Sequence, residues 1–211
     1  MVRYLPVSTA ITVLLYFLGI ASAGLVCAEI TTVDKAIKPI VIGKADAPVT
    51  IIEYASLGCS HCAQFHQKIY PKLKKTYIDT GKVKLIFTDF PLNTPALAAS
   101  MIARCAGPTR YLGFVDLFFQ AQEQWNRADN PLEALKKIAR FGGLSSEDVG
   151  QCLNQQPLID YLQETARKAN SEHKINSTPS FIINGKKVTG AIDYEKFRSI
   201  IDEALKLAKQ P

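Results

Sequence analysis

A strand-like run of apolar residues leads directly into two cysteines that stand three positions apart. Residues 49–55 are Val-Thr-Ile-Ile-Glu-Tyr-Ala, and a short apolar run of this kind is typical of a strand buried on both faces of a sheet. A Ser-Leu-Gly turn follows, and apolar side chains then recur at helical spacing from Cys59 onward. A second strand is predicted over residues 83–87, after the turn at Gly81. The sequence therefore predicts a β-α-β unit in which Cys59 and Cys62 lie where the strand passes into the helix.

The rest of the chain adds a block of helices and a C-terminal hairpin. Beyond Pro91, helices are predicted over residues 94–106, 110–124, 131–141, 145–155 and 157–173. Two short strands, 180–183 and 186–189, flank Asn184-Gly185, a strong sequence signal for a β-hairpin. An amphipathic helix closes the chain, with an apolar face made of Phe197, Ile200, Ile201, Ala204, Leu205 and Ala208. This order predicts an α/β fold interrupted by an all-helical insertion.

The charge of the chain does not indicate a nucleic-acid partner. The 25 Lys and Arg residues exceed the 19 Asp and Glu residues, giving a net charge of +6. The lysines are scattered along polar faces, as at Lys72, Lys74 and Lys75, and no Arg-rich run or aromatic RNA-binding motif accompanies them. We therefore interpret the positive charge as a solvated surface.

The N-terminal segment predicts export. Residues 4–28 carry no charged side chain and are mostly apolar, between Arg3 and Glu29. A basic start, an apolar stretch and small residues at the end are typical of a secretory signal peptide, here residues 1–28. Cleavage after Ala23 or after Ala28 fits the pattern. An uncleaved N-terminal membrane anchor is the alternative, because the stretch is just long enough to span a bilayer.

Export places the cysteines in an oxidising compartment, where their spacing indicates disulfide chemistry before metal chemistry. Cleavage after Ala28 would leave four cysteines, which can form two pairs, whereas cleavage after Ala23 would leave a fifth. Parity therefore favours the later site. The five positions are Cys27, Cys59, Cys62, Cys105 and Cys152.

Cys59 and Cys62 are the candidate reactive pair. At a helix N-terminus, unpaired backbone N–H groups favour a thiolate at Cys59, and His61 can donate a hydrogen bond or positive charge to the same sulfur. The i, i+3 spacing places Cys62 on the same helical face, as the resolving thiol. Two alternatives are a structural disulfide and a metal site that adds His66 on the same face. Zinc would need a fourth ligand, and no second paired motif supplies one.

Glu53 interrupts the apolar strand six residues before Cys59. A carboxylate in such a run is costly unless it is hydrogen-bonded or protonated. The first interpretation is therefore a buried acid with a specific partner. The alternative is an edge position whose side chain reaches solvent.

These residues together resemble a known family. The strand with Glu53, the Cys59-Ser60-His61-Cys62 motif and Thr178-Pro179 are similar to the DsbA-like thiol:disulfide oxidoreductases, which have a thioredoxin-like fold with an inserted helical domain. The resemblance implies a thioredoxin-like domain over residues 29–90 and 175–211 and a helical insertion over 91–174. It also implies a periplasmic enzyme that passes disulfides to reduced or unfolded exported proteins. A quinone-linked membrane partner would re-oxidise it. The implied redox group is the Cys59–Cys62 disulfide itself, with no other cofactor and no metal.

The resemblance assigns roles to individual residues. It implies that Pro179 is cis and, with Thr178, binds substrate beside the active-site disulfide, and that Glu53 relays a proton to or from Cys62. A proline that merely begins the strand at Phe181 is the alternative. Ser60 and Thr178 stand where the best-known oxidases of the family have Pro and Val, and both positions bear on the redox potential.

Cys105 and Cys152 both fall in the helical block. We expect a disulfide between them, because the compartment is oxidising and some members of the family carry a second, non-catalytic disulfide. Two buried free thiols are the alternative.

Three functions remain to be distinguished: a dithiol oxidase, a disulfide isomerase or reductase, and a periplasmic metal-binding protein. Family isomerases oligomerise through an added N-terminal segment. Only about 20 residues separate the cleavage site from the strand at Val49, which is too few for such a domain. They include residues 39–42, a β-prone run that we expect to add a strand to the sheet. The sequence therefore predicts a monomeric oxidase.

Overall fold

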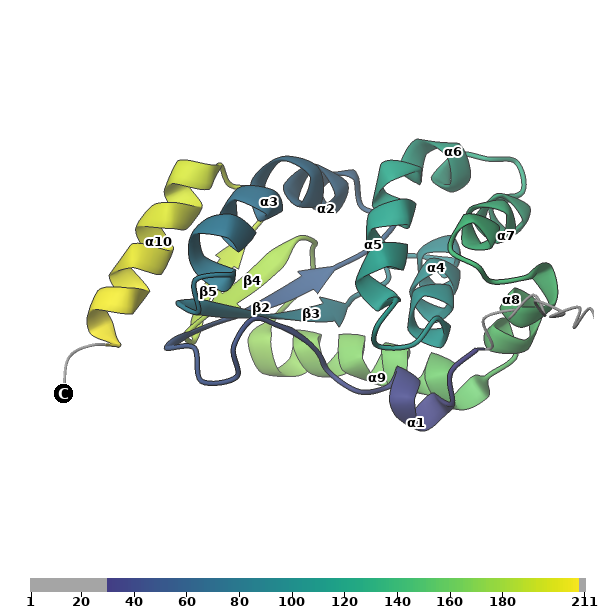
Figure 1. Cartoon of the computed structure of the whole chain (residues 1–211), viewed down its shortest axis with the longest axis horizontal. Coiled ribbons are helices and arrows are strands. Elements are labelled where there is room, and N and C mark those ends of the chain that lie inside the picture. Colours follow the sequence, from purple (N-terminus) through teal and green to yellow (C-terminus); the bar gives the residue numbers. More distant parts are fainter. Residues whose placement is uncertain (1–29, 209–211) are drawn as a thin grey trace, which may run out of the picture.

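The computed structural model describes residues 30–208. The predicted signal peptide, with Cys27 and both cleavage points, lies outside the described residues. Within them, one mixed sheet is covered by helices on both faces, and a group of further helices extends from one end of the sheet (Figure 1). The helical block lies between the third and fourth strands of the chain, so the predicted α/β fold with a helical insertion is confirmed. No helix in residues 30–208 combines the length and apolar character needed to cross a bilayer.

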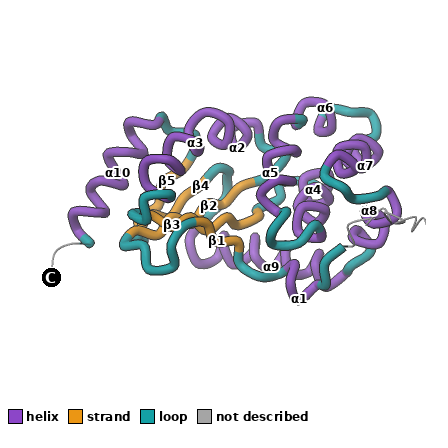
Figure 2. Tube along the Cα trace, viewed as in Figure 1, coloured by secondary structure: helices purple, strands orange, loops and turns teal. Residues whose placement is uncertain are grey.

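The five strands of this sheet are ordered β1-β3-β2-β4-β5 (Figure 2). Strands β2 and β3 are parallel, whereas β1 pairs with β3, and β4 with β2 and β5, in antiparallel fashion. The first strand is formed by the β-prone run near residue 40. β2 is a central strand, and helices cover both faces of the sheet, so side chains on both faces of β2 are buried, which explains its almost unbroken apolar sequence. The strands are β1 (Ile40–Ile42), β2 (Val49–Ala55), β3 (Val83–Asp89), β4 (Ser180–Ile183) and β5 (Lys186–Thr189).

The turn between β4 and β5 follows its sequence signal. Asn184 and Gly185 have φ values of 44° and 86°, the left-handed backbone that a two-residue hairpin turn requires. The Oδ1 atom of Asn184 also accepts a hydrogen bond of 2.8 Å from the backbone N–H of Thr50. The turn therefore ties the hairpin to the start of β2.

Helices cover the two faces of the sheet. The helix after Cys59 and the C-terminal helix lie on one face, and the longest helix of the insertion lies on the other (Figure 1). The buried face of the C-terminal helix contains Phe197, Ile200, Ile201 and Ala204, as predicted, whereas Ala208 is exposed. These helices are α2 (Ser60–Gln64), η1 (Phe65–Ile69), α3 (Tyr70–Leu73), η2 (Lys74–Ile78), α9 (Gln156–His173) and α10 (Tyr194–Leu207).

The insertion shares its core with the sheet. A single cluster of buried side chains includes Ile51 and Phe87 from the sheet and Phe118 and Leu135 from the helical block. The two parts therefore fold around continuous apolar packing. The remaining helices are α1 (Val33–Ala36), α4 (Thr94–Cys105), α5 (Tyr111–Gln120), α6 (Gln122–Asn126), α7 (Pro131–Phe141) and α8 (Ser146–Leu153).

One predicted helix is wrong in its extent. The sequence pattern indicated a continuous helix over residues 110–124, but α5 ends at Gln120 and α6 begins at Gln122. Ala121, between them, has φ −94° and ψ 11°. Beyond this break the Gln122 side chain is buried and hydrogen-bonded to the turn before α2. Tertiary hydrogen bonding therefore overrides the helical periodicity.

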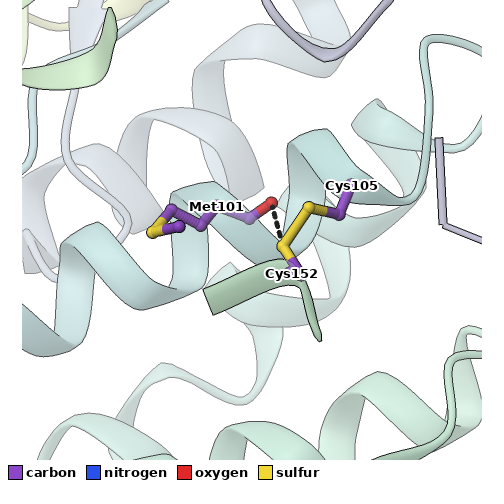
Figure 3. Close-up of a disulfide and its surroundings, with 3 residues drawn as sticks. All are labelled: Met101, Cys105 and Cys152. Carbon is purple, nitrogen blue, oxygen red and sulfur yellow. Dashed lines mark hydrogen bonds between the residues drawn. A yellow bond between two sulfur atoms is a disulfide. The ribbon is translucent and has the colours of Figure 1, made fainter. Parts of the chain in front are cut away.

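A disulfide joins Cys105, at the end of α4, to Cys152 on α8 (Figure 3). Both residues are fully buried. The Sγ atom of Cys152 lies 3.2 Å from the carbonyl oxygen of Met101. This is a packing contact, because a disulfide sulfur carries no hydrogen to donate. The bond closes a long loop that contains helices α5 to α7.

Replacement of both Cys105 and Cys152 by Ala is expected to lower the free energy of unfolding by about 4 kcal/mol. The bond spans a sequence separation of 47, and the chain-entropy model gives that magnitude for a loop of this length. Urea unfolding of the oxidised proteins measures the difference. Alkylation of Cys59 at pH 6 should be unchanged, because neither cysteine contacts the CxxC turn. Equal unfolding midpoints for the two proteins would contradict the expectation.

Candidate active site

The two cysteines of the CxxC motif differ sharply in exposure. Cys59 is the N-cap of α2, with extended backbone (φ −88°, ψ 120°), and its side chain is half-buried. Cys62, one turn later, is completely buried. Both are free thiols in this structure. Substrate can therefore reach Cys59, whereas Cys62 is placed to react from inside.

The helical insertion holds the turn that carries Cys59. The Gln122 amide donates hydrogen bonds to the carbonyl oxygens of Leu57 (2.6 Å) and Cys59 (3.0 Å). The Asn126 amide donates to the carbonyl of Gly58 at 3.1 Å. Sequence reasoning missed both side chains, because isolated Gln and Asn residues in a helical block form no motif. Their contacts fix the position of the reactive cysteine.

The Cys59 thiol is strongly acidified. A hydrogen bond from the Cys62 thiol lowers the pKa of Cys59 most, burial opposes the shift, and the Thr178 side chain and the backbone N–H groups of Cys62 and His61 lower it further. The resulting pKa is about 5, against 9.0 for an ordinary thiol. Burial, the hydrogen bond to Cys59 and the nearby negative charges of Cys59 and Glu53 raise the pKa of Cys62 well above its usual value.

His61 acts on Cys59 through its backbone. Its side chain is exposed, and within residues 30–208 the imidazole makes no hydrogen bond or ion pair. Its backbone N–H, at the start of α2, hydrogen-bonds to the Cys59 sulfur and is one of the groups that lower the pKa of Cys59. The backbone hydrogen bonds expected at the helix N-terminus are therefore present. The hydrogen bond or positive charge expected from the His61 side chain is not found within residues 30–208.

Thr178 and Pro179 form a wall beside Cys59. The peptide bond between them is cis, immediately before β4. The Cys59 Sγ atom lies 3.2 Å from the carbonyl oxygen of Thr178, to which the protonated thiol can donate. Antiparallel pairing of β4 with β2 places Ser180 opposite Tyr54 and so brings this loop to the end of the strand that precedes the motif. The sheet thus joins residues 119 positions apart in the sequence.

Glu53 lies in the interior. Its side chain is completely buried in the central strand, so the alternative of a solvent-facing edge position is wrong. Its Oε1 atom is 2.9 Å from the Nε2 atom of His66, which is also buried. His66 was considered as a metal ligand with Cys59 and Cys62. The structure instead pairs it with Glu53, and the described residues contain no cluster of three or more His, Cys, Asp or Glu side chains that could hold a metal ion.

A widened helical turn carries His66. Residues Phe65–Ile69 form a π-helical turn, and Pro71 follows two residues later. Proline has no N–H for the bond to Gln67, and its ring crowds the carbonyl of that residue, which opens the helix at this point. The Gln67 side chain donates to the carbonyl of Phe119 on α5 at 3.1 Å. The local sequence thus turns the His66 side chain toward the sheet, where it contacts Glu53 of β2.

A polar cavity of about 580 Å³ lies beside the motif. It runs between the first turns of α2 and the helices α5 and α6. Its walls carry hydroxyl, imidazole and amide groups that can hydrogen-bond to a peptide, among them Ser60, His61, Gln64, Gln67 and Gln120. The site therefore combines an accessible thiolate, a buried second thiol and a neighbouring groove.

Comparisons with known proteins find a thioredoxin family model and relatives that are named for disulfide chemistry. Residues 35–203 match the model of a family described as thioredoxin. A putative protein-disulfide oxidoreductase of Rickettsia felis is 33% identical over 171 residues, which are 81% of this chain and 61% of that protein. The chain thus spans about three fifths of the length of that relative. Disulfide bond formation protein D of Bacillus subtilis is 25% identical over 175 residues, covering 79% of this chain and 77% of that protein.

Two solved structures share the fold. The crystal structure of Wolbachia pipientis alpha-DsbA1 superposes with a TM-score of 0.75 at 32% identity, covering 81% of this chain and 92% of that one. The structure of oxidised BdbD from Bacillus subtilis gives a TM-score of 0.71 at 23% identity, covering 85% and 97% of the two chains. The sheet, the CxxC helix and the insertion described above form this shared architecture.

Proposed function

Because the chain belongs to the thioredoxin family, among its DsbA-like members, we propose that it is a thiol:disulfide oxidoreductase that introduces disulfides into exported proteins. The observation that carries this proposal is the asymmetry of the two thiols. Cys59 is accessible and its pKa is about 5, whereas Cys62 is buried and its pKa is raised. Such a pair can exchange disulfides through one sulfur and complete the exchange through the other.

The reaction proceeds by two displacements. A substrate thiolate attacks the Cys59 sulfur of the enzyme disulfide; the Cys59–Cys62 bond breaks, and Cys62 leaves with the electron pair and takes up a proton. A second substrate thiolate attacks the first substrate sulfur; the bond to Cys59 breaks, and Cys59 leaves as a thiolate. The substrate loses two electrons and two thiol protons. Cys62 gains one of these protons and the solvent receives the other.

Stabilisation of the leaving thiolate favours the oxidising direction. Each unit by which the pKa of Cys59 is lowered makes the reduced enzyme more favourable by about 1.4 kcal/mol at a pH above both values, before solvent screening of this half-buried group is counted. The reduced form of the enzyme is thereby stabilised relative to its disulfide. An enzyme whose reduced form is stabilised is an oxidant toward ordinary protein thiols.

Substrate binding is proposed at the wall formed by Thr178 and Pro179. The cis peptide bond turns the chain beside the Cys59 thiol, and proline has no backbone N–H. An extended substrate segment could pair with the neighbouring backbone and place its cysteine over Cys59. The polar cavity on the other side of α2 is positioned for the chain that flanks this cysteine.

The proposed setting is the bacterial periplasm, with reduced or unfolded exported proteins as substrates. The disulfide between Cys105 and Cys152 supports an oxidising compartment. Each turnover leaves two electrons on the enzyme, and we propose a quinone-linked membrane protein as their acceptor. The protein is expected to act as a monomer without a nucleic-acid partner.

A paired assay tests the direction of the proposed reaction. One equivalent of the oxidised protein should convert about one equivalent of a reduced two-cysteine peptide to its disulfide in a single turnover, whereas it should refold a scrambled multi-disulfide protein poorly. Cys59→Ala should abolish both reactions, and the Cys105→Ala/Cys152→Ala variant should retain peptide oxidation. Strong refolding of the scrambled protein, together with a stable dimer or trimer in light scattering, would assign the protein as an isomerase instead.

A further inference from the structure

The pair of Glu53 and His66 is a buried polar contact that the exchange steps above leave without a role. Glu53 comes from β2 and His66 from the π turn η1, and their side chains are 0% and 4% exposed. The contact satisfies one atom of each group. The Oε2 atom of Glu53 and the Nδ1 atom of His66 have no hydrogen-bond partner within the described residues. Buried polar atoms without partners are costly and often mark functional sites.

Cys62 creates a need for proton transfer at this place. Its thiol must gain a proton when the active-site disulfide is reduced and lose it when the disulfide is re-formed. The side chain is completely buried, and the charge of Glu53 is one of the nearby charges that raise the pKa of Cys62. Water therefore cannot exchange this proton from the surface side, and a group inside the protein has to carry it.

His66 connects Glu53 to the surface. Its imidazole lines a cavity of about 360 Å³ whose other walls include Tyr70, Lys74, Asp116 and Gln120. Asp116 and Gln120 are exposed and Lys74 is half-buried, so the cavity opens to solvent. One face of the imidazole stacks on Phe119, with ring centroids 4.7 Å apart. The ring is thus held between the buried carboxyl group and a solvent-filled opening.

The groups around His66 leave a single anionic partner in direct contact. From β2 it faces Glu53, and from β3 it faces the apolar ring of Phe87. From α3 it faces Tyr70, whose pKa is raised by burial and by the charge of Glu53, so that the phenol stays neutral. On α5, Asp116 lies near enough for the His66 charge to oppose the rise that desolvation causes in the pKa of Asp116. Lys74, farther along the cavity wall, is paired with Asp79.

We propose that His66 is a positioning residue of the exchange reaction: its imidazole holds the Glu53 carboxyl beneath the CxxC motif and passes protons between that carboxyl and the solvent of the cavity beside Asp116. The inference rests on the proposed function and extends the expected role of Glu53 to a second residue. When Cys62 attacks a mixed disulfide at Cys59, its thiol proton passes to Glu53 and from there through His66 to solvent. The new Cys59–Cys62 bond forms, the bond from Cys59 to the bound thiol breaks, and that thiol leaves with the electron pair.

The release of glutathione from Cys59 isolates this step. Reduced protein is mixed with oxidised glutathione to form the mixed disulfide, and the rate at which Cys62 expels glutathione is followed by acid quench between pH 5 and 9. His66→Gln keeps an amide that can donate to Glu53 but cannot pass a proton. We expect release at pH 7 to slow by roughly tenfold or more, with a steeper rise toward high pH, because solvent hydroxide must replace the internal base. Lys74→Ala, on the wall of the same cavity, should stay within about twofold of wild type, because Lys74 is paired with Asp79 and not with His66.

Chemical rescue separates proton transfer from a structural role. His66→Ala removes the ring and enlarges the cavity, so added imidazole should restore much of the lost release rate, whereas an equal concentration of a bulky buffer of the same pKa should not. Slow release without rescue, or release from His66→Gln at the wild-type rate throughout the pH range, would overturn the inference. Asp116→Asn, at an exposed position, extends the test if a His66 variant fails to fold. Release from it should be several-fold slower, and an unchanged rate would overturn the proposed route.

The same experiment tests the proposed function and the role of His66 separately. Formation of the glutathione adduct on Cys59 depends only on the proposed disulfide exchange. Wild-type protein that forms no adduct would therefore refute the proposed function. An adduct that forms normally and resolves equally fast in the wild type and in folded His66 variants would refute only the role of His66.

Discussion

Alkylation of Cys59 in the reduced protein is expected to be half-maximal near pH 5, because the pKa of this thiol is about 5. At pH 6 about nine tenths of Cys59 would be thiolate, against about a thousandth of an ordinary thiol of pKa 9.0. The thiolate fraction of Cys59 at this pH should therefore be on the order of a thousandfold larger than that of a model thiol. Because iodoacetamide reacts with the thiolate, Cys59 should be labelled first. Cys62 should remain unlabelled, because it is buried and its pKa is raised. Peptide mapping after a short pulse identifies the labelled residue.

Two substitutions at Cys62 test the cause of this acidity. The hydrogen bond from the Cys62 thiol is the largest contribution that lowers the pKa of Cys59. Cys62→Ala removes the donor and should move the alkylation midpoint to higher pH, whereas Cys62→Ser keeps a hydroxyl donor and should move it less. Labelling of Cys62 before Cys59 in acid would contradict the assignment of the nucleophile. Midpoints in both variants equal to that of the wild type would show that the Cys62 thiol does not lower the pKa of Cys59.

Arg104→Met is expected to destabilise the protein by about 3–5 kcal/mol, the cost of leaving one partner of a buried ion pair unpaired. Arg104, on α4, donates to the carboxylate of Asp89 at the end of β3 at 2.7 Å, and to the carbonyl of Ala36 at 2.7 Å. The Tyr111 hydroxyl donates to the other carboxylate oxygen at 3.0 Å. This network joins the N-terminal segment, the sheet and the insertion. Urea unfolding with the Cys105–Cys152 bond intact measures the loss.

Matched variants separate the ion pair from packing. Lys136→Ala removes one partner of the more exposed pair with Glu133 on α7, and should cost no more than about 1 kcal/mol. Arg104→Met combined with Asp89→Leu removes both buried charges, and should recover much of the loss because no carboxylate is left unpaired. A change below about 1 kcal/mol for Arg104→Met alone would mean that Asp89 finds another partner or becomes protonated at little cost.

The strands and helices could be predicted from the sequence more completely than the tertiary contacts between them. The strand at residues 49–55, the helix at 131–141 and the hairpin around Asn184 agree with the structure because each depends on local periodicity, capping or turn chemistry. The interruption at Ala121 could not be predicted in this way, since it depends on where the side chain of Gln122 finds its partners. Those partners lie more than 60 residues away in the chain.

The same division applies to the site. The spacing of Cys59 and Cys62 was enough to predict that the two thiols lie together at the start of a helix. The position of Pro179 beside them could be predicted only from the family resemblance. The contact between Glu53 and His66 was not inferred, although both residues were singled out. A helix of regular pitch gives no reason to turn His66 toward the sheet, and the π turn that does so depends on Pro71 and on the packing of Phe119. His61 shows the reverse case, in which a conspicuous residue acts through its backbone.

The equilibrium between the Cys59–Cys62 pair and glutathione, measured as a function of pH, tests the central claim most directly. Reduction of the enzyme disulfide by two glutathione molecules places one proton on Cys62 and leaves Cys59 as a thiolate, so one proton is released to solvent at any pH above about 5. The equilibrium constant for reduction should therefore be flat below pH 5 and rise about tenfold per pH unit from pH 6 to 8. The Cys59–Cys62 pair should be mostly reduced in a glutathione buffer that leaves structural disulfides oxidised. A constant that does not change over this pH range would mean that Cys59 carries its proton in the reduced enzyme. That result would contradict the account of the protein as an oxidant driven by a stabilised Cys59 thiolate.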